Sequence, residues 1–278
     1  MADSHPLTLT VLGSAGAYRT HQGSRASGYL VEHGSTRLVL DLGHGTYAPL
    51  AGHLGIDALP QIGAIAISHL HPDHWVDLAA LRHALVHGNQ MGRDARSVSV
   101  IAPSGLSSRL ASLLDDRTPE EQSLGAAEPV QPFGISLWRS DATLPPLGGG
   151  RVVPVGDVTM RGARVRHTGE SYAIRLSVDD QPGLTYSGDL SHWEDLAAIA
   201  QRGDTLLCEA GGGVAAWREG DAHITAYGAG SAAAATGARR LLLTHFGAEV
   251  DPADACRAAA TTFSGEIIAV REGDRFTI

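Results

Sequence analysis

Ser68-His69-Leu70-His71-Pro72-Asp73-His74 places three histidines and one aspartate within one short stretch. The stretch directly follows the apolar run 64–67, which predicts a buried strand, so these side chains emerge where a strand ends. His69 and His71 are two residues apart and can point the same way from an extended loop. Asp73 and His74 continue into the next predicted helix and can face a second ion. Imidazole and carboxylate together suit Zn²⁺, with Mn²⁺ or Fe as alternatives, so the stretch predicts a metal site.

On both sides of this stretch, short runs rich in Val, Ile and Leu alternate with helix-like segments. The predicted strands lie at 7–12, 29–31, 37–40, 64–67, 98–101, 163–165, 173–178, 184–186, 205–208, 241–243 and 267–270. The predicted helices lie at 75–87, 105–114, 193–201, 225–236 and 252–262. This order indicates a mixed α/β protein.

Residues 115–150 are rich in proline and end in three consecutive glycines, so they predict an irregular connection. A domain boundary is the alternative interpretation. Because the candidate ligands lie on both sides of this segment and must converge on one site, we expect a single domain over residues 1–278.

Composition limits the classes of partner. Hydrophobic residues make up 43% of the chain and charged residues 18%, as in ordinary globular proteins. A net charge of -9 provides no overall positive field for a nucleic acid or a membrane surface. The first residues lack a targeting pattern, and no run reaches the ~18 apolar residues of a membrane span, so we expect a cytoplasmic protein. Cys208 and Cys256, the two cysteines, are predicted to be free buried thiols.

The spacing His69-x-His71-x-Asp73-His74 resembles the signature of the metallo-β-lactamase superfamily, and four further motifs occur in the family's order. The resemblance spans nearly the whole chain. It implies an α/β protein with the metallo-β-lactamase αββα four-layer sandwich. The further motifs are Leu38-Val39-Leu40-Asp41-Leu42-Gly43, Val165-Arg166-His167-Thr168-Gly169-Glu170-Ser171-Tyr172, Tyr186-Ser187-Gly188-Asp189 and Leu242-Leu243-Thr244-His245-Phe246.

The resemblance also implies a role for each motif residue. Asp41 would orient a ligand histidine from outside the metal shell. The first ion would take His69, His71, His167 and Asp189, and the second would take Asp73, His74, Asp189 and His245. A solvent molecule between two cations would have its pKa lowered toward neutrality and would act as a hydroxide nucleophile, so no serine or cysteine nucleophile is required. We count Asp73 among the catalytic residues as well as among the ligands.

Two more elements resemble the ribonuclease Z-like branch of the family. They are Cys208-Glu209-Ala210 after a predicted strand and Ala222-His223-Ile224-Thr225 before a predicted helix. The resemblance implies that His223 is a general acid for the leaving oxygen and that Glu209 orients it. The alternatives are a helix-entry residue without a role for His223 and a structural salt bridge for Glu209. His44 and His192 lie near motif residues and are candidates to line the pocket.

One feature of ribonuclease Z is missing. Its long basic arm is inserted between the third and fourth motifs, but His167 and Asp189 are only 22 positions apart here. Without that arm, and with an acidic chain, we do not expect a nucleic acid as the partner. No membrane partner is expected either, and the dimers common in the resembling family allow a homodimer.

These observations favour a dinuclear phosphodiesterase that acts on a small substrate such as a cyclic nucleotide. The start Arg25-Ala26-Ser27-Gly28-Tyr29-Leu30 is similar to that of actinobacterial cyclic-AMP phosphodiesterase-like proteins. Gly169, inserted in the third motif, and Leu190, after the bridging aspartate, depart from that branch. The alternatives are a thioesterase or lactonase on the same metals, a ribonuclease Z-type tRNA 3′ processing endonuclease, and a metal-stabilised binding protein without turnover.

Overall fold

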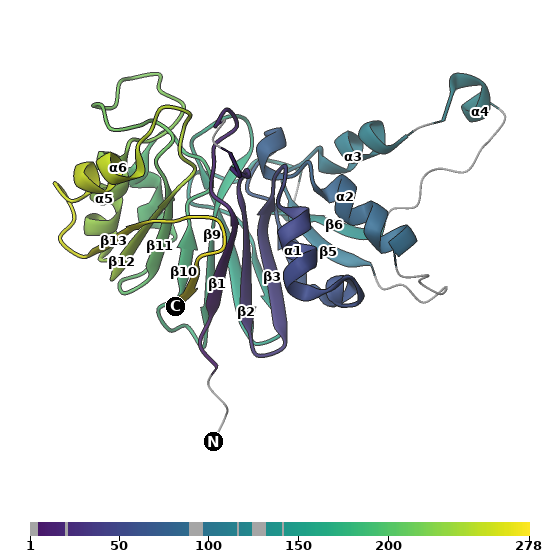
Figure 1. Cartoon of the computed structure of the whole chain (residues 1–278), viewed down its shortest axis with the longest axis horizontal. Helices are drawn as coiled ribbons and strands as arrows, with labels where there is room; N and C mark the ends of the chain where they lie inside the picture. The colour runs from purple at the N-terminus through teal and green to yellow at the C-terminus, as the bar shows by residue number, and fades with distance from the viewer. Residues whose placement is uncertain (1–4, 20–21, 89–96, 116, 124–131, 141) are drawn as a thin grey trace.

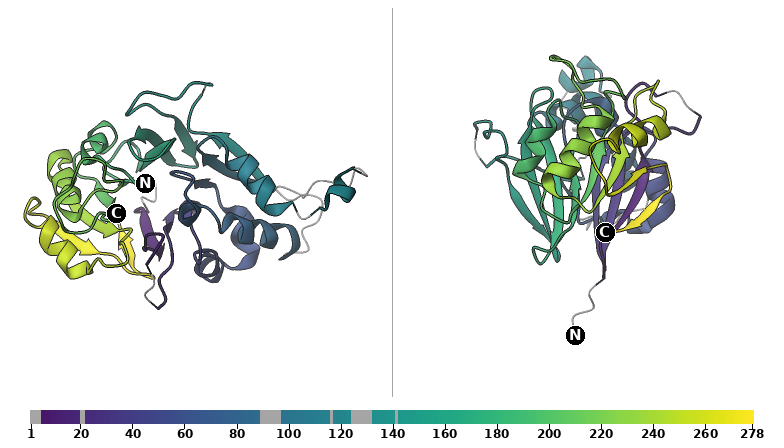
Figure 2. Two further views of the ribbon diagram at one scale, coloured as in Figure 1. Left: turned by 90° about the horizontal axis from the view of Figure 1, so that it is seen from above. Right: turned by 90° about the vertical axis from the view of Figure 1, so that its left-hand side faces the viewer.

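The computed structural model describes residues 5–19, 22–88, 97–115, 117–123, 132–140 and 142–278. In this part of the chain, two seven-stranded sheets lie face to face and helices cover their outer faces (Figure 1). Seen from above, the helices of the first half lie on one side of the sheets and those of the second half on the other (Figure 2). The predicted αββα sandwich is thereby confirmed.

The first sheet has the strand order β14-β1-β2-β3-β4-β5-β6. Its strands are β1 (Thr8–Gly13), β2 (Gly28–His33), β3 (Thr36–Leu42), β4 (Ala64–Ala66), β5 (Val98–Ala102), β6 (Phe133–Leu137) and β14 (Arg275–Thr277). Three helices cover its outer face: α1 (Tyr47–Leu54), α2 (Leu78–His83) and α3 (Leu106–Leu114). Their buried leucines, Leu50, Leu78 and Leu106, pack in one cluster with Val39 of β3.

The second sheet has the order β13-β12-β11-β10-β9-β8-β7. Its strands are β7 (Val152–Val155), β8 (Val158–Val165), β9 (Ser171–Val178), β10 (Leu184–Tyr186), β11 (Thr205–Glu209), β12 (Arg240–Thr244) and β13 (Glu266–Ala269). Helices α5 (Ala226–Thr236) and α6 (Pro252–Ala259) and the 3-10 helix η4 (Trp193–Ala198) cover it. Helix α5 is built from small residues because α6 packs closely against it: a Cβ on Gly230 would lie 2.4 Å from the Ala259 carbonyl oxygen.

The main core lies between the two sheets. Side chains alternate along a strand, so Leu38 and Leu40 of β3 enter this core while Val39 faces the helices. Ile174 and Leu176 of β9 enter the same core from the second sheet. Each sheet is covered on one face by the other sheet and on the opposite face by helices, so side chains on both faces are buried. The strands were therefore recognisable as apolar runs.

The parallel strands of both sheets end at one edge of the sandwich, which we call the functional edge. Strands β3 to β6 are parallel, and so are strands β10 to β13. Parallel strands end at the same edge of a sheet, so the loops after them gather there. A bridge between Ala15, just after β1, and Phe246, just after β12, joins the two sheets at this edge.

Several predicted elements differ from the structure. The segment 115–150, predicted to be irregular, contains β6 and the short helix α4 (Pro119–Ser123), which lies away from the sheets (Figure 1). Strand β6 was not predicted because it is a half-exposed edge strand in which buried and exposed residues do not alternate clearly. The predicted helix 75–87 begins only at Leu78 and ends in a π-helical turn, Ala84–Gly88, and the predicted helix 193–201 is the 3-10 helix η4.

Two further findings concern sequence features outside the sheets. Cys208 and Cys256 are free thiols, as predicted, but only Cys208 is fully buried. None of the helices in the described ranges is long and apolar enough to cross a membrane.

A buried ion pair supports the second sheet and allows a stability test. Arg175 of β9 donates to Asp204 through Nε at 2.8 Å and Nη2 at 3.0 Å, and Asp204 also accepts from Thr185 Oγ1 and the Gly183 N–H. Asp204→Asn should lower the free energy of unfolding by about 3–5 kcal/mol, because it leaves the buried guanidinium without its counter-charge. Chemical denaturation at pH 7 measures the effect.

The pH dependence of the same pair has a definite sign. Burial alone would raise the pKa of the Asp204 carboxyl, but the bonds from Arg175 and neighbouring N–H groups hold it below its usual value. The stabilisation is therefore present above the unfolded-state pKa of about 3.9 and is lost as the pH falls through the lower folded-state pKa. Asp115→Asn, which alters a half-buried surface pair with Arg117, is the control and should move the denaturation midpoint far less. A normal midpoint for Asp204→Asn would contradict the assigned role of the pair.

Candidate metal centre

Each candidate ligand follows the end of a strand at the functional edge. The histidine-rich stretch follows β4, His167 follows β8, Asp189 follows β10 and His245 follows β12. The approach to Asp189 requires a glycine, because Gly188 has φ +57° and a Cβ there would lie 2.8 Å from the Tyr172 carbonyl oxygen. His245 itself has φ 54°, a left-handed conformation that is costly for a residue with a Cβ.

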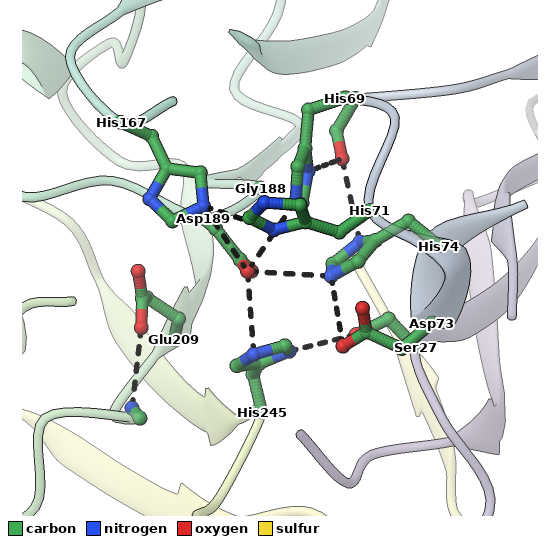
Figure 3. A network of polar contacts seen from close by, with 12 residues as sticks. Ser27, His69, His71, Asp73, His74, His167, Gly188, Asp189, Glu209 and His245 are labelled. Carbon is green, nitrogen blue, oxygen red and sulfur yellow. Dashed lines mark hydrogen bonds and ion pairs between the residues drawn. The ribbon is translucent and has the colours of Figure 1, made fainter. Parts of the chain in front are cut away.

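Asp189 lies at the centre of a ring of histidines (Figure 3). Its Oδ2 atom lies within 3.3 to 3.8 Å of four Nε2 atoms, those of His69 at 3.6 Å, His74 at 3.3 Å, His167 at 3.8 Å and His245 at 3.3 Å. One carboxylate oxygen thus faces two pairs of imidazoles.

Within the described residues, the side chains that match the predicted ligands form two of three groups that could hold an ion; the third, Asp189, His223 and His245, overlaps both. Within each group, the ligand atoms all lie within 4.8 Å of one another. The first group is His69, His71, His167 and Asp189, and the second is Asp73, His74 and His245. These are the two predicted ligand sets, with Asp189 placed between them. The structure therefore brings all seven predicted ligands together.

The chemistry of these atoms fits metal ions. Within the described residues, His69 Nε2, His74 Nε2 and both carboxylate oxygens of Asp189 are buried and have no hydrogen-bond partner. Buried polar atoms in folded proteins are nearly always hydrogen-bonded, and each exception requires an explanation. Convergent nitrogen and oxygen atoms without such partners are what divalent-metal ligands present.

Groups outside the cluster fix the orientation of the histidine rings. His74 Nδ1 lies 2.7 Å from Asp41 Oδ2, so the ring donates its Nδ1–H to Asp41 and leaves Nε2 for a metal. Asp41 also accepts from the Ser68 N–H and from the Tyr186 hydroxyl, each at 2.7 Å. His245 Nδ1 lies 3.0 Å from Ser27 Oγ. Asp41 thus occupies its predicted position.

Sequence reasoning missed the roles of Ser27 and Tyr186. Both residues stood inside quoted motifs, but nothing in the sequence indicated that they approach His245 and Asp41 across the sandwich. His167 is held in a third way, with its Nδ1 2.9 Å from the Ala222 carbonyl oxygen, so this ring donates there and presents Nε2 to the cluster.

The electrostatics favour the deprotonated forms of His69, His71, His245 and Asp189, but not that of His74. Burial lowers the pKa of His69, His71 and His245, which keeps these rings neutral. The pKa of Asp189 is well below its usual value, because the facing histidines outweigh the effect of its burial. The pKa of His74 is raised well above its usual value, since Asp189 and Asp41 outweigh burial. Metal uptake must therefore displace a proton from His74.

Glu209 and His223 form a pair at the border of the cluster. His223 Nδ1 lies 3.0 Å from Glu209 Oε2 and 3.8 Å from Asp189 Oδ2. Glu209 is fully buried and also accepts from the backbone N–H groups of Leu190 and Gly211. Burial opposes protonation of His223, but Glu209 outweighs it and raises the pKa of His223 to about 9. The pair has the geometry of an orienter and an acid.

A cavity of about 470 Å³ opens over the cluster. His71, Asp73, Asp189, His223 and His245 all contribute to its wall. His44 lines it as predicted, whereas His192 does not and instead lines a neighbouring cavity.

With this geometry in place, residues 13–246 match the family described as the beta-lactamase superfamily domain. The chain belongs to this superfamily. A metal-dependent hydrolase is accordingly expected of the family, and the two clusters of histidine and aspartate could hold the divalent ions.

Relatives of this superfamily member cover it almost completely. An uncharacterized protein of Mycobacterium leprae is 30% identical over 271 residues, 97% of this chain and 88% of the relative. Ribonuclease Z of Thermobifida fusca is 27% identical over 303 residues, 97% of this chain and 94% of the relative. The crystal structure of the metallo-beta-lactamase fold protein YhfI from Bacillus subtilis superposes with a TM-score of 0.77 at 23% identity, covering 98% and 99% of the two chains. The chain is thus similar to the ribonuclease Z-like branch, as predicted.

The two departures from the branch pattern have structural explanations. Gly169 has φ +59° in the turn after His167, and the following Glu170 accepts from Ser104 Oγ at 2.5 Å and from the Tyr172 hydroxyl at 2.8 Å. Leu190 cannot donate from its side chain, but its backbone N–H donates to Glu209 Oε1 at 2.6 Å. The main chain thereby holds Glu209 without a hydroxyl at position 190.

Proposed function

We propose that this hydrolase is a dinuclear phosphodiesterase that acts on a small substrate such as a cyclic nucleotide. The observation that carries the proposal is the His223–Glu209 pair beside Asp189. An alkoxide leaving group is poor and gains from a proton in the transition state, whereas a thiolate leaves readily without one. A fixed acid beside the metal ligands therefore favours a phosphodiester over a thioester.

When bound by the seven ligands, two divalent ions supply a solvent nucleophile of lowered pKa and neutralise charge on the phosphoryl oxygens. The protein's own residues complete the reaction. As the new bond to phosphorus forms and the ester P–O bond breaks, His223 gives its proton to the departing oxygen. Glu209 holds the His223 ring through Nδ1, so we assign the donated proton to the opposite nitrogen.

Two features of the chain bear on the size of the substrate. Of the 21 residues between His167 and Asp189, 11 belong to β9 and β10, so no gripping arm is inserted between these ligands. The net charge of -9 adds no attraction for a polyanion. Both features support a small substrate over a transfer RNA, although ribonuclease Z of Thermobifida fusca is a relative.

The test compares substrate sizes with the zinc-loaded protein. We expect hydrolysis of 3′,5′-cyclic nucleotides, or of another small diester, to exceed cleavage of pre-tRNA by the isolated protein. Thioesters and lactones belong in the same screen, and a ribonuclease Z preparation serves as the positive control for pre-tRNA. Efficient cutting of pre-tRNA at one position, at physiological salt, would show that the small-substrate proposal is wrong. Thioester or lactone turnover without diester turnover would show that the phosphodiesterase proposal is wrong.

A further inference from the structure

A second cavity, of about 440 Å³, adjoins the metal centre. Its wall includes Ser191, His192, Trp193, Trp217 and Tyr227. Two of the four tryptophans of the chain, Trp193 and Trp217, thus line this cavity. The other two, Trp75 and Trp138, are buried in the protein interior.

The backbone places residues of this aromatic cavity next to Asp189 and His223 in the chain. Ser191 is two residues after Asp189, and the Ile224 N–H donates to the Leu190 carbonyl oxygen at 3.0 Å, so the chain segments of Asp189 and His223 are tied together. Asp189 and His223 line the metal cavity, and Ser191 and Ile224, which are close to them in the chain, line the aromatic cavity.

One loop borders both cavities. It begins at Gly211 and ends at His223, which both line the metal cavity, while Trp217 in its middle lines the aromatic one. The indole of Trp217 meets the edge of the His192 ring, with centroids 5.2 Å apart and planes at 64°. Trp217 is still 39% exposed and Tyr227 is 53% exposed, so part of each side chain is accessible from outside the protein.

Aromatic walls of this kind bind planar rings by stacking. Ser191 and the exposed Glu194 add polar atoms to the wall, which suit the ring nitrogens and amino groups of a heterocycle better than an aliphatic chain. We propose that the aromatic cavity binds the nucleobase of a nucleotide substrate, with Trp217 as the main stacking surface. This inference rests on the proposed phosphodiesterase function.

The experiment uses two substrates that differ only in the base. Adenosine 3′,5′-cyclic phosphate and 1-O-methylribose 3′,5′-cyclic phosphate share the same scissile bond and leaving oxygen. Trp217→Ala should lower kcat/KM about tenfold or more for the nucleotide and leave that for the base-free compound unchanged. Trp217→Phe, which keeps a ring, should restore most of the difference. Leu113→Ala, at an exposed apolar position of α3 outside both cavities, is the control and should change neither rate.

The outcomes separate this inference from the proposed function. If Trp217→Ala slows both substrates equally, the indole supports the loop that carries His223, and base binding at this cavity is refuted while the phosphodiesterase proposal stands. If the wild-type protein hydrolyses neither substrate, binding of adenosine 5′-monophosphate measured by calorimetry decides the question. If Trp217→Ala weakens this binding, base binding at the aromatic cavity is supported without the proposed activity. If the wild-type protein does not bind the nucleotide, or if Trp217→Ala leaves binding unchanged, base binding at the aromatic cavity is refuted.

Discussion

Replacing Asp189 with alanine should remove both metal ions and reduce hydrolysis about 10³-fold or more. The reason is that its Oδ2 atom faces both ligand groups, with His69 and His167 on one side and His74 and His245 on the other. The ions supply several kcal/mol of transition-state stabilisation, and each 1.36 kcal/mol is a factor of ten in rate. Elemental analysis after reconstitution with excess zinc and a diesterase assay measure the two effects.

A matched variant distinguishes the shared ligand from a single-site ligand. Asp73 belongs only to the second group, so Asp73→Ala should keep about one ion per chain where the wild-type protein keeps two. Circular dichroism on each variant checks that the fold is retained. Two retained ions in Asp189→Ala, or a wild-type protein that saturates at one ion, would contradict the bridging assignment.

His223→Ala should reduce kcat for an alkyl phosphodiester by about 10²–10⁴-fold and leave the metal content unchanged. An alkoxide needs the proton that His223 donates, whereas the p-nitrophenolate of bis-p-nitrophenyl phosphate leaves without one. The loss on the aryl diester should therefore be much smaller. Steady-state rates on both diesters, with metal analysis of each preparation, measure the difference.

The pH profile provides an independent readout of the same role. An acid must carry its proton, and Glu209 raises the pKa of His223, so the wild-type rate on an alkyl diester should fall as the pH rises through that pKa. His223→Ala should lack this fall, and Glu209→Gln should move it to lower pH with a smaller loss of kcat. Equal slowing of both diesters would instead assign His223 to phosphate binding. No slowing of either would favour the thioesterase or lactonase alternative.

The apolar runs predicted most of the strands, and the resemblance of five motifs to the metallo-β-lactamase superfamily implied the sandwich and the seven ligands. Each ligand stands within a few residues of an apolar strand, and a strand end fixes where its loop emerges. Strands β6, β7 and β14 were missed because their exposed or half-buried residues give a weak pattern. Helix α1 was missed as well, since only Leu50 of its residues is fully buried.

The contacts that the sequence did not reveal are those between distant segments. Ser27 and His245 are 218 positions apart, and Tyr186 and Asp41 are 145 apart. Neither spacing carries a signal in a single sequence, because the contacts arise only when the two sheets pack. The aromatic cavity is another case, since His192 and Trp217 belong to different segments, which the hydrogen bond from the Ile224 N–H to the Leu190 carbonyl oxygen joins.

The division of the ligands between the two sheets has a consequence for the whole molecule. His69, His71, Asp73 and His74 extend from the first sheet, whereas His167, Asp189 and His245 extend from the second. Ions bound there would link the two halves of the sandwich, because only the folded chain brings both sets of ligands together. An increase in free metal would then shift the unfolding equilibrium further toward the native state, so the metal concentration would affect stability as well as catalysis.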